Sequence, residues 1–136
     1  MRSLELTTLY DFAEQQGIHI DCYDLAYIDC LSILDDGECY IGINPLILSS
    51  YAEEKIKLAH EVGHCETGSF YNENTPRYIR ERCEARADKW AIKKLIPKDE
   101  LIKAYKDGIS DNFELADYFG VTEDFMRKAI TYYCNV

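Results

Sequence analysis

The sequence lacks any segment that would place the chain in a membrane or export it. No run approaches the roughly 20 apolar residues that a membrane-spanning helix needs. Residues 1–6 contain no apolar core of the kind found in signal peptides, and they already include the acidic Glu5. These absences exclude a membrane protein and a classical secreted one, so we expect a cytoplasmic protein.

The six cysteines show no C-x-x-C pair and no regular spacing. Without an export signal, this pattern argues against a disulfide scaffold and predicts reduced thiols that mostly pack in the core. Cys65 directly follows His64, so on a helix it points about 100° away from that histidine. We therefore expect Cys65 to pack and not to bind metal.

Basic residues are scarce relative to acidic ones. The chain has 15 Lys and Arg against 25 Asp and Glu, a net charge of −10. Nucleic-acid binding depends on basic surface, so direct binding to DNA or RNA is not expected. A basic protein partner is compatible with this charge. The 136 residues, 47% of them apolar, are enough for one domain (1–136) with its own core.

The apolar spacing predicts an α+β fold with a small, largely antiparallel or mixed sheet. A first helix is expected over residues 3–16, followed by strands at 18–23, 26–34 and 38–43, with Asp35-Asp36-Gly37 as a hairpin turn. Ser50 and Glu53 form a capping box that begins the next helix, which Gly68 ends. A long helix is expected with Thr75 as its N-cap, Pro76 as its first residue and Ile96 near its end, and shorter helices are expected over 98–106, 111–119 and 122–134.

The most informative segment lies in the first of the two central helices and has the sequence His60-Glu61-Val62-Gly63-His64. Histidines four residues apart on a helix lie about 40° apart on one face, so both imidazoles can reach one Zn²⁺. Glu61 lies beside them, where a carboxylate can act as general base toward a zinc-activated water. The segment therefore predicts two metal ligands and a catalytic Glu61.

A catalytic zinc needs a third protein ligand, and histidine cannot supply it nearby, because His19 lies in a predicted strand far upstream. On the long helix, Glu84 falls about 140° from Ile79, at the edge of the apolar arc, where it would face the motif helix. Glu84 is therefore the expected third ligand, and Asp88 is the fallback. Asp88 could instead accept a hydrogen bond from a ligand histidine or form a solvated ion pair.

These segments resemble the ImmA/IrrE metallopeptidases. The family pattern H-E-x-G-H, then E-x-x-A-(N/D)-x-(F/W)-A, then L-(M/I/V)-P is matched by residues 60–64, 84–91 and 95–97. The resemblance covers residues 38–105 well, and the short chain is similar to phage and mobile-element members. It implies a zincin-like, gluzincin-type domain in which a small sheet packs on the H-E-x-x-H helix and on a second ligand-bearing helix. It also implies a zinc site of His60, His64 and Glu84 with Glu61 as base.

The same resemblance implies a substrate class, because characterised relatives cleave helix-turn-helix repressors. It does not identify the oxyanion donor, for which Tyr71, Arg77 and Tyr78 are candidates. In zincins the strand before the motif helix often receives the substrate by β-addition, which predicts residues 38–43 as that edge. We therefore expect a zinc endopeptidase acting on a DNA-binding repressor of a phage or mobile element.

Two other functions are compatible with parts of the sequence. A zinc site need not be catalytic, so the chain could be a zinc-stabilised module that binds and sequesters a repressor or another protein. Residues 112–129 have the apolar spacing of a helix-turn-helix, with Gly120 in the turn. The second helix of that unit begins Thr122-Glu123-Asp124, and acids there would repel phosphates, so two packing helices are the preferred interpretation.

Overall fold

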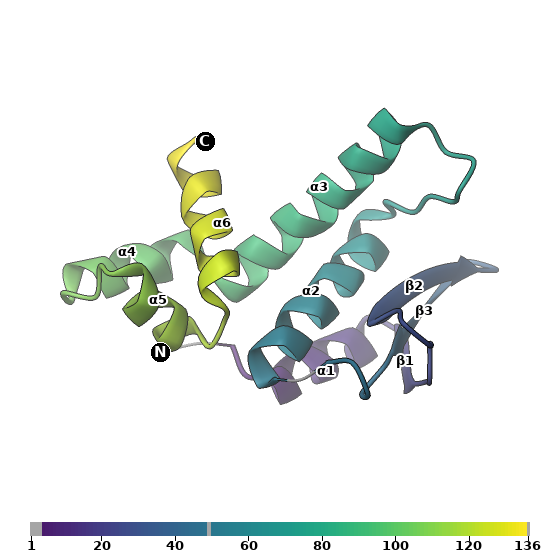
Figure 1. The fold of residues 1–136 in the computed structure, drawn as a ribbon, viewed down its shortest axis with the longest axis horizontal. Coiled ribbons are helices and arrows are strands. Elements are labelled where there is room, and N and C mark those ends of the chain that lie inside the picture. Colours follow the sequence, from purple (N-terminus) through teal and green to yellow (C-terminus); the bar gives the residue numbers. More distant parts are fainter. Residues whose placement is uncertain (1–3, 49, 136) are drawn as a thin grey trace.

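The computed structural model describes residues 4–48 and 50–135 and contains six helices and three strands within them (Figure 1). In chain order these are α1 (Leu6–Gln15), β1 (His19–Cys22), β2 (Cys30–Asp35), β3 (Glu38–Ile43), α2 (Tyr51–Thr67), α3 (Arg77–Leu95), α4 (Lys98–Lys106), α5 (Asn112–Phe119) and α6 (Glu123–Cys134). The predicted α+β class is confirmed. In the described part of the chain, no helix is both long and apolar enough to cross a membrane.

The three strands form a mixed sheet in the order β1-β3-β2. β3 pairs with β1 in parallel and with β2 in an antiparallel hairpin. Because β3 is paired on both sides, the prediction that residues 38–43 form the free edge is wrong. The edge strand that packs against α2 is β2 instead.

The segment 23–29 connects β1 to β2 across the end of β3, where the sequence predicted that a strand begins at residue 26. The fully buried Asn44 holds this crossover, because its Nδ2 donates to the carbonyl oxygens of Ala26 and Ile28 at 3.2 and 3.1 Å. These two bonds anchor the backbone of the crossover to the residue that follows β3. The second strand therefore begins only at Cys30.

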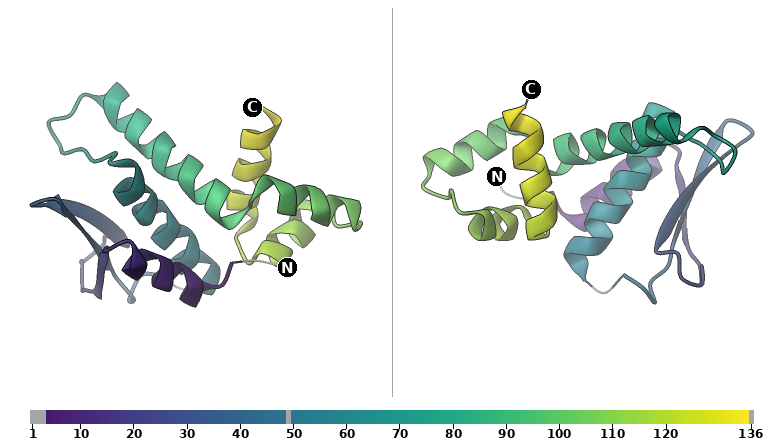
Figure 2. Two further views of the ribbon diagram at one scale, coloured as in Figure 1. Left: turned by 180° about the vertical axis from the view of Figure 1, so that it is seen from behind. Right: turned by 45° about the horizontal axis from the view of Figure 1, so that its top comes forward.

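The sheet has one covered and one open face. Alternation along β3 turns Cys39, Ile41 and Ile43 toward the helices, where all three are buried. Helices α1 and α2 make the contacts with the strands, and the helices lie to one side of the sheet in both views of Figure 2. The apolar core therefore lies between the sheet and helices α1 and α2, and it continues between α2 and α3.

The ends of α2 are set by the predicted residues. Ser50 caps the N-terminus, since its side chain accepts a hydrogen bond from the Glu53 amide at 3.1 Å. At the other end Gly68 has a left-handed backbone with φ of 66°, which suits a residue without a Cβ. The long helix α3 begins one residue later than expected, at Arg77, with Pro76 as its N-cap.

Helices α2 and α3 pack unusually closely at Gly63. A Cβ built on this residue would lie 2.8 Å from the carbonyl oxygen of Ala87 and 3.2 Å from the Cβ of Trp90. Since real Cβ atoms essentially never approach so closely, only glycine fits at this contact. The close approach brings the central turns of α2 and α3 together, and these turns carry the candidate site residues.

The C-terminal helices close the core as the two-helix interpretation predicts. Phe119 of α5 and Met126 of α6 are almost fully buried. Lys55 of α2 is also completely buried, and its ammonium donates to the carbonyl oxygens of Leu4 and Phe119 at 3.0 and 2.8 Å. This lysine thereby connects α2 with the C-terminal end of α5.

The expectation that all cysteines are reduced is wrong for one pair. Cys39 of β3 and Cys65 of α2 form a disulfide, with their Cα atoms 5.9 Å apart. The other four cysteines are free, with Cys30 and Cys83 buried. Cys65 therefore neither packs as a free thiol nor binds metal, and it ties the sheet to the helix that carries the two motif histidines.

Candidate metal centre

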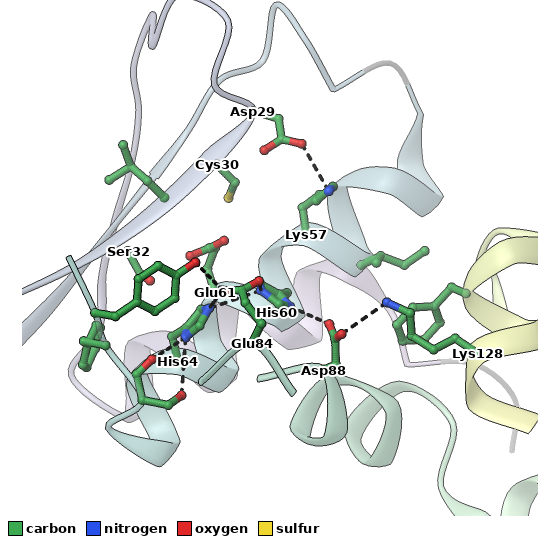
Figure 3. A pocket seen from close by; sticks show the side chains of 16 residues that line it. Asp29, Cys30, Ser32, Lys57, His60, Glu61, His64, Glu84, Asp88 and Lys128 are labelled. Carbon is green, nitrogen blue, oxygen red and sulfur yellow. Dashed lines mark hydrogen bonds and ion pairs between the residues drawn. The ribbon is translucent and has the colours of Figure 1, made fainter. Parts of the chain in front are cut away.

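A cleft of about 550 Å³ lies between the edge strand β2 and the helices α2, α3 and α6 (Figure 3). The motif residues His60, Glu61 and His64 enter it from α2, and Glu84 and Asp88 from α3. Strand β2 contributes Cys30, Leu31 and Ser32, and α6 contributes Phe125 and Lys128. Four elements distant in sequence thus surround one group of titratable side chains.

The two histidines point their Nε2 atoms toward each other, 3.2 Å apart. Each Nδ1 has its own partner, the carbonyl oxygen of Ser69 at 2.6 Å for His64 and the Asp88 carboxylate at 2.8 Å for His60. Because a carbonyl and a carboxylate only accept, each Nδ1 can keep its proton and leave Nε2 as the nitrogen that binds a metal. Both Nε2 lone pairs are then directed into the cleft.

Glu84 completes the group from the facing helix, as the helical wheel predicted. Its Oε1 lies 3.0 Å from Nε2 of His60, and its Oε2 lies 2.9 Å from Nε2 of His64. One ligand atom from each of the three residues lies within 4.8 Å of the others. A carboxylate with about two-fifths of its side chain exposed remains accessible from the cleft.

This donor set fits a zinc ion. With bonds of about 2.0–2.1 Å, a tetrahedral zinc holds neighbouring ligand atoms about 3.3 Å apart. The distances among the two Nε2 atoms and the Glu84 oxygens are 2.9 to 3.2 Å, close to that value. Two neutral imidazoles and one carboxylate also leave room for a fourth position on the cleft side.

Asp88 combines the two roles that the sequence left open. One carboxylate oxygen contacts Nδ1 of His60, and the other accepts from the ammonium of Lys128 on α6 at 3.3 Å. Burial raises the pKa of Asp88, but the hydrogen bond with His60 and the charge of Lys128 outweigh this and lower the pKa overall. Asp88 therefore stays ionised and orients His60.

The pKa of His60 responds to the same surroundings. Burial lowers the pKa, but the Asp88 hydrogen bond and the nearby carboxylates outweigh burial and raise the pKa above its usual value. Three negative side chains, Glu61, Glu84 and Asp88, contribute to this rise. The surroundings of His60 therefore carry a net negative charge, which favours a cation among the candidate ligands.

Glu61 lies beside the histidines, on the side of the cleft nearer Cys30 and Ser32 (Figure 3). Its charge is among the factors that raise the pKa of the Cys30 thiol, after the larger effect of burial. The carboxylate is therefore adjacent to the candidate ligands without replacing one of them. This is the position required for a general base next to a metal.

Of the three candidate oxyanion donors, only Tyr71 lines the cleft. Its hydroxyl donates to Oε2 of Glu84 at 2.9 Å, and its ring lies edge-on to His64. Arg77 pairs with Glu81 at the surface, and the exposed Tyr78 ring lies under the guanidinium of Arg82. Burial and the bond to Glu84 raise the pKa of Tyr71, so it stays a proton donor.

Other residues of interest lie outside the centre or could not be found from the sequence. His19 is on β1, where it contacts Glu38 at 2.6 Å, so it is an ordinary strand residue as expected. Lys57 and Lys128 line the cleft and pair with Asp29 and Asp88. The paired residues are separated in the sequence by 28 and 40 positions, so no local sequence pattern could predict these ion pairs.

The arrangement defines an α+β domain with a candidate His-His-Glu metal centre facing the edge of a small sheet. The chain belongs to the IrrE N-terminal-like domain family, Peptidase_M78, whose model matches residues 13–131. A solved structure of a Mycobacterium tuberculosis transcriptional regulator has a similar fold, with a TM-score of 0.67 and 15% identity over 93% of this chain. The match covers 40% of that regulator, so this chain spans less than half of its length. No curated protein matches the sequence significantly.

Proposed function

We propose that this protein is a zinc-dependent endopeptidase with a zincin-like fold. The observation that carries the proposal is the convergence of His60, His64 and Glu84, with Glu61 beside them in an open cleft. A purely structural zinc site is closed by four protein ligands, whereas a catalytic one keeps a position open. Three converging ligands and a neighbouring carboxylate favour catalysis, and the family supports peptide hydrolysis.

Each residue has a defined task in this proposal. His60, His64 and Glu84 hold the zinc, and Asp88 and the Ser69 carbonyl keep the two imidazoles oriented. The bound zinc supplies Lewis acidity, which activates water and stabilises negative charge on the scissile carbonyl. Glu61 accepts the proton of the attacking water and returns it to the leaving amine nitrogen.

Tyr71 is proposed to stabilise the developing oxyanion. Its hydroxyl already lies at the ligand Glu84, on the rim of the cleft. A donor at that position can turn toward the carbonyl oxygen as charge accumulates there. Neither Arg77 nor Tyr78 lines the cleft, so Tyr71 is the donor that the proposal uses.

The substrate is proposed to bind as an extended segment along β2. One edge of β2 pairs with β3, and the strand itself borders the cleft through Cys30, Leu31 and Ser32. An extended peptide can add to a free strand edge by main-chain hydrogen bonds. This replaces the predicted site on β3, which has no free edge.

The substrate itself is proposed to be a helix-turn-helix repressor of a phage or mobile element, cleaved in the cytoplasm. Family membership supports this class. The net charge of −10 also favours a basic partner, and DNA-binding proteins present basic surface.

The experiment is cleavage of a purified helix-turn-helix repressor, taken from the gene beside this one, by zinc-loaded protein. We expect defined fragments by mass spectrometry, none after chelation, and none with Glu61→Gln, which should still bind zinc. Glu66→Gln makes the same change at an exposed position of α2 and should cleave normally. If Glu61→Gln relieves repression in cells as well as wild type, the chain sequesters its partner and the peptidase proposal fails.

A further inference from the structure

The face of the sheet that is turned away from the helices is uncovered and apolar. The register places Ile33 of β2 opposite Tyr40 of β3 on this face, and the two side chains are 53% and 41% exposed. The crossover adds Tyr23, whose ring packs against Gly42, 3.3 Å from where a Cβ would lie. Together these residues line a depression of about 570 Å³. We call this surface, lined by Tyr23, Leu25, Leu31, Ile33 and Tyr40, the outer face.

The carboxylates at the outer face lie in the acidic part of the sequence, and His19 on β1 contacts one of them, Glu38, at 2.6 Å. Residues 1–54 contain a single basic residue, Arg2, and eleven acidic ones, whereas residues 55–136 contain 14 of each sign. The whole net charge of −10 therefore belongs to the segment that forms α1, the sheet and the first turn of α2. Asp21, Asp35 and Glu38 are exposed and lie on the outer face by register.

The outer face is continuous with the metal centre. Leu31 lines both the outer depression and the cleft that holds the candidate ligands. Its neighbours Cys30 and Ser32 point to the cleft side, since side chains alternate along a strand. A polypeptide lying along β2 at the cleft therefore reaches the outer face by passing over a single strand.

We propose that the outer face is a docking surface for a positively charged, partly apolar segment of the protein substrate. The proposal rests on the proposed function, since it assigns this surface to the substrate of that peptidase. Apolar side chains supply contact area, and the acidic surroundings select the sign of the partner. The same charges repel nucleic acid, anionic lipid and the outer face of a second copy, so a basic polypeptide is the partner that fits.

The first test measures binding without cleavage, with the full-length Glu61→Gln variant loaded with zinc. The probes are two synthetic peptides, one alternating Lys with Leu and one alternating Glu with Leu. By NMR we expect the lysine peptide to shift the amide signals of β2, β3 and the crossover, with an affinity that falls as salt rises. The glutamate peptide should leave these signals unchanged. Equal binding of both peptides, or shifts confined to α5 and α6, would overturn the proposal.

A matched pair of triple variants separates the outer face from net charge. Asp21→Asn, Asp35→Asn and Glu38→Gln together should weaken binding of the lysine peptide about ten-fold, the product of three modest surface attractions. The control makes the same three kinds of change at exposed acids of the C-terminal half, Asp107→Asn, Glu114→Gln and Asp117→Asn. Equal weakening in both triple variants would mean that only net charge matters, and the docking surface would be rejected.

The second test uses cleavage by zinc-loaded protein that is otherwise wild type. Tyr40→Ser on the outer face, in the central strand β3, should lower kcat/KM for the intact repressor about ten-fold and leave it unchanged for a short peptide spanning the cut. Phe113→Ser, at an exposed aromatic position of α5, should alter neither. Equal kcat/KM of Tyr40→Ser and wild type on the intact repressor would overturn the docking surface. Binding at the outer face with no cleavage of any substrate would instead overturn the proposed function.

Discussion

Gly63→Ala tests whether the close approach of α2 and α3 builds the metal centre. The added Cβ would lie 2.8 Å from the carbonyl oxygen of Ala87, where ordinary contacts begin at 3.4 Å, so the helices must separate by about 0.6 Å at this point. Overpacking of this kind costs about 1–3 kcal/mol. Alanine recovers about 1 kcal/mol of helix propensity over glycine. The free energy of unfolding should therefore fall by at most about 2 kcal/mol.

The same displacement should weaken the metal site more than the fold. Gly63 lies between the two ligand histidines, and Ala87 lies one turn from Glu84, so separation at this contact moves Glu84 away from the imidazoles. Zinc affinity should fall about ten-fold or more, as for other changes that disturb ligand orientation. The loss of stability is measured by urea unfolding of the metal-free protein. The loss of zinc affinity is measured by competition against a coloured chelator.

The control is Glu66→Ala, which replaces an exposed residue of the same helix and should leave zinc affinity unchanged. A Gly63→Ala variant that is as stable as wild type and binds zinc equally would refute the reasoning. The helix pair would then have enough room for a methyl group, and the glycine would have no part in assembling the centre.

The remaining predictions concern single side chains. At saturating zinc, Tyr71→Phe should lower kcat about 100-fold with little change in KM, since an oxyanion donor acts in the transition state; a change in KM alone would contradict this. Burial lowers the pKa of Lys55 from 10.5 to about 8. Between pH 8 and 10.5 the unfolded chain therefore binds more protons than the folded protein does. The free energy of unfolding should rise with pH across this range, by about 3 kcal/mol. Urea titrations at pH 7.5 and 10.5 should show this rise in wild type but not in Lys55→Met. An equal change in the free energy of unfolding with pH in both proteins would contradict the prediction. Cys39→Ser should destabilise the oxidised protein by about 3 kcal/mol through loss of the loop closed by Cys65, and thiol titration of unfolded wild type should find four free thiols, not six.

Local signals in the sequence were sufficient for the helices. Ser50 and Gly68 set the ends of α2 through a side-chain cap and a left-handed backbone, both of which depend only on neighbouring residues. Glu84 was placed correctly against the histidines because helix periodicity fixes which side chains share a face. The same periodicity brought Asp88 to the correct side of α3.

Contacts between distant segments could not be predicted in the same way. The run from residue 26 to 34 is mostly apolar, with Asp29 and Ser32 as polar exceptions. Its first part is held in a crossover by the buried Asn44, which lies outside the run and donates to the carbonyls of Ala26 and Ile28. Parallel pairing of β1 with β3 makes β3 the central strand, and the sequence of residues 38–43 alone does not predict that pairing. The disulfide of Cys39 with Cys65 likewise depends on how the sheet packs against α2.

In the proposed function, the cleft hydrolyses peptide bonds with zinc and Glu61. The most direct test incubates zinc-loaded protein with a proteome-derived peptide library in water enriched in ¹⁸O, because hydrolysis leaves the label in each new carboxyl terminus. We predict labelled carboxyl termini with wild type and none with Glu61→Gln, although both proteins bind one zinc ion. Labelled products from Glu61→Gln at the wild-type rate, or none from the zinc-loaded wild type, would contradict the claim.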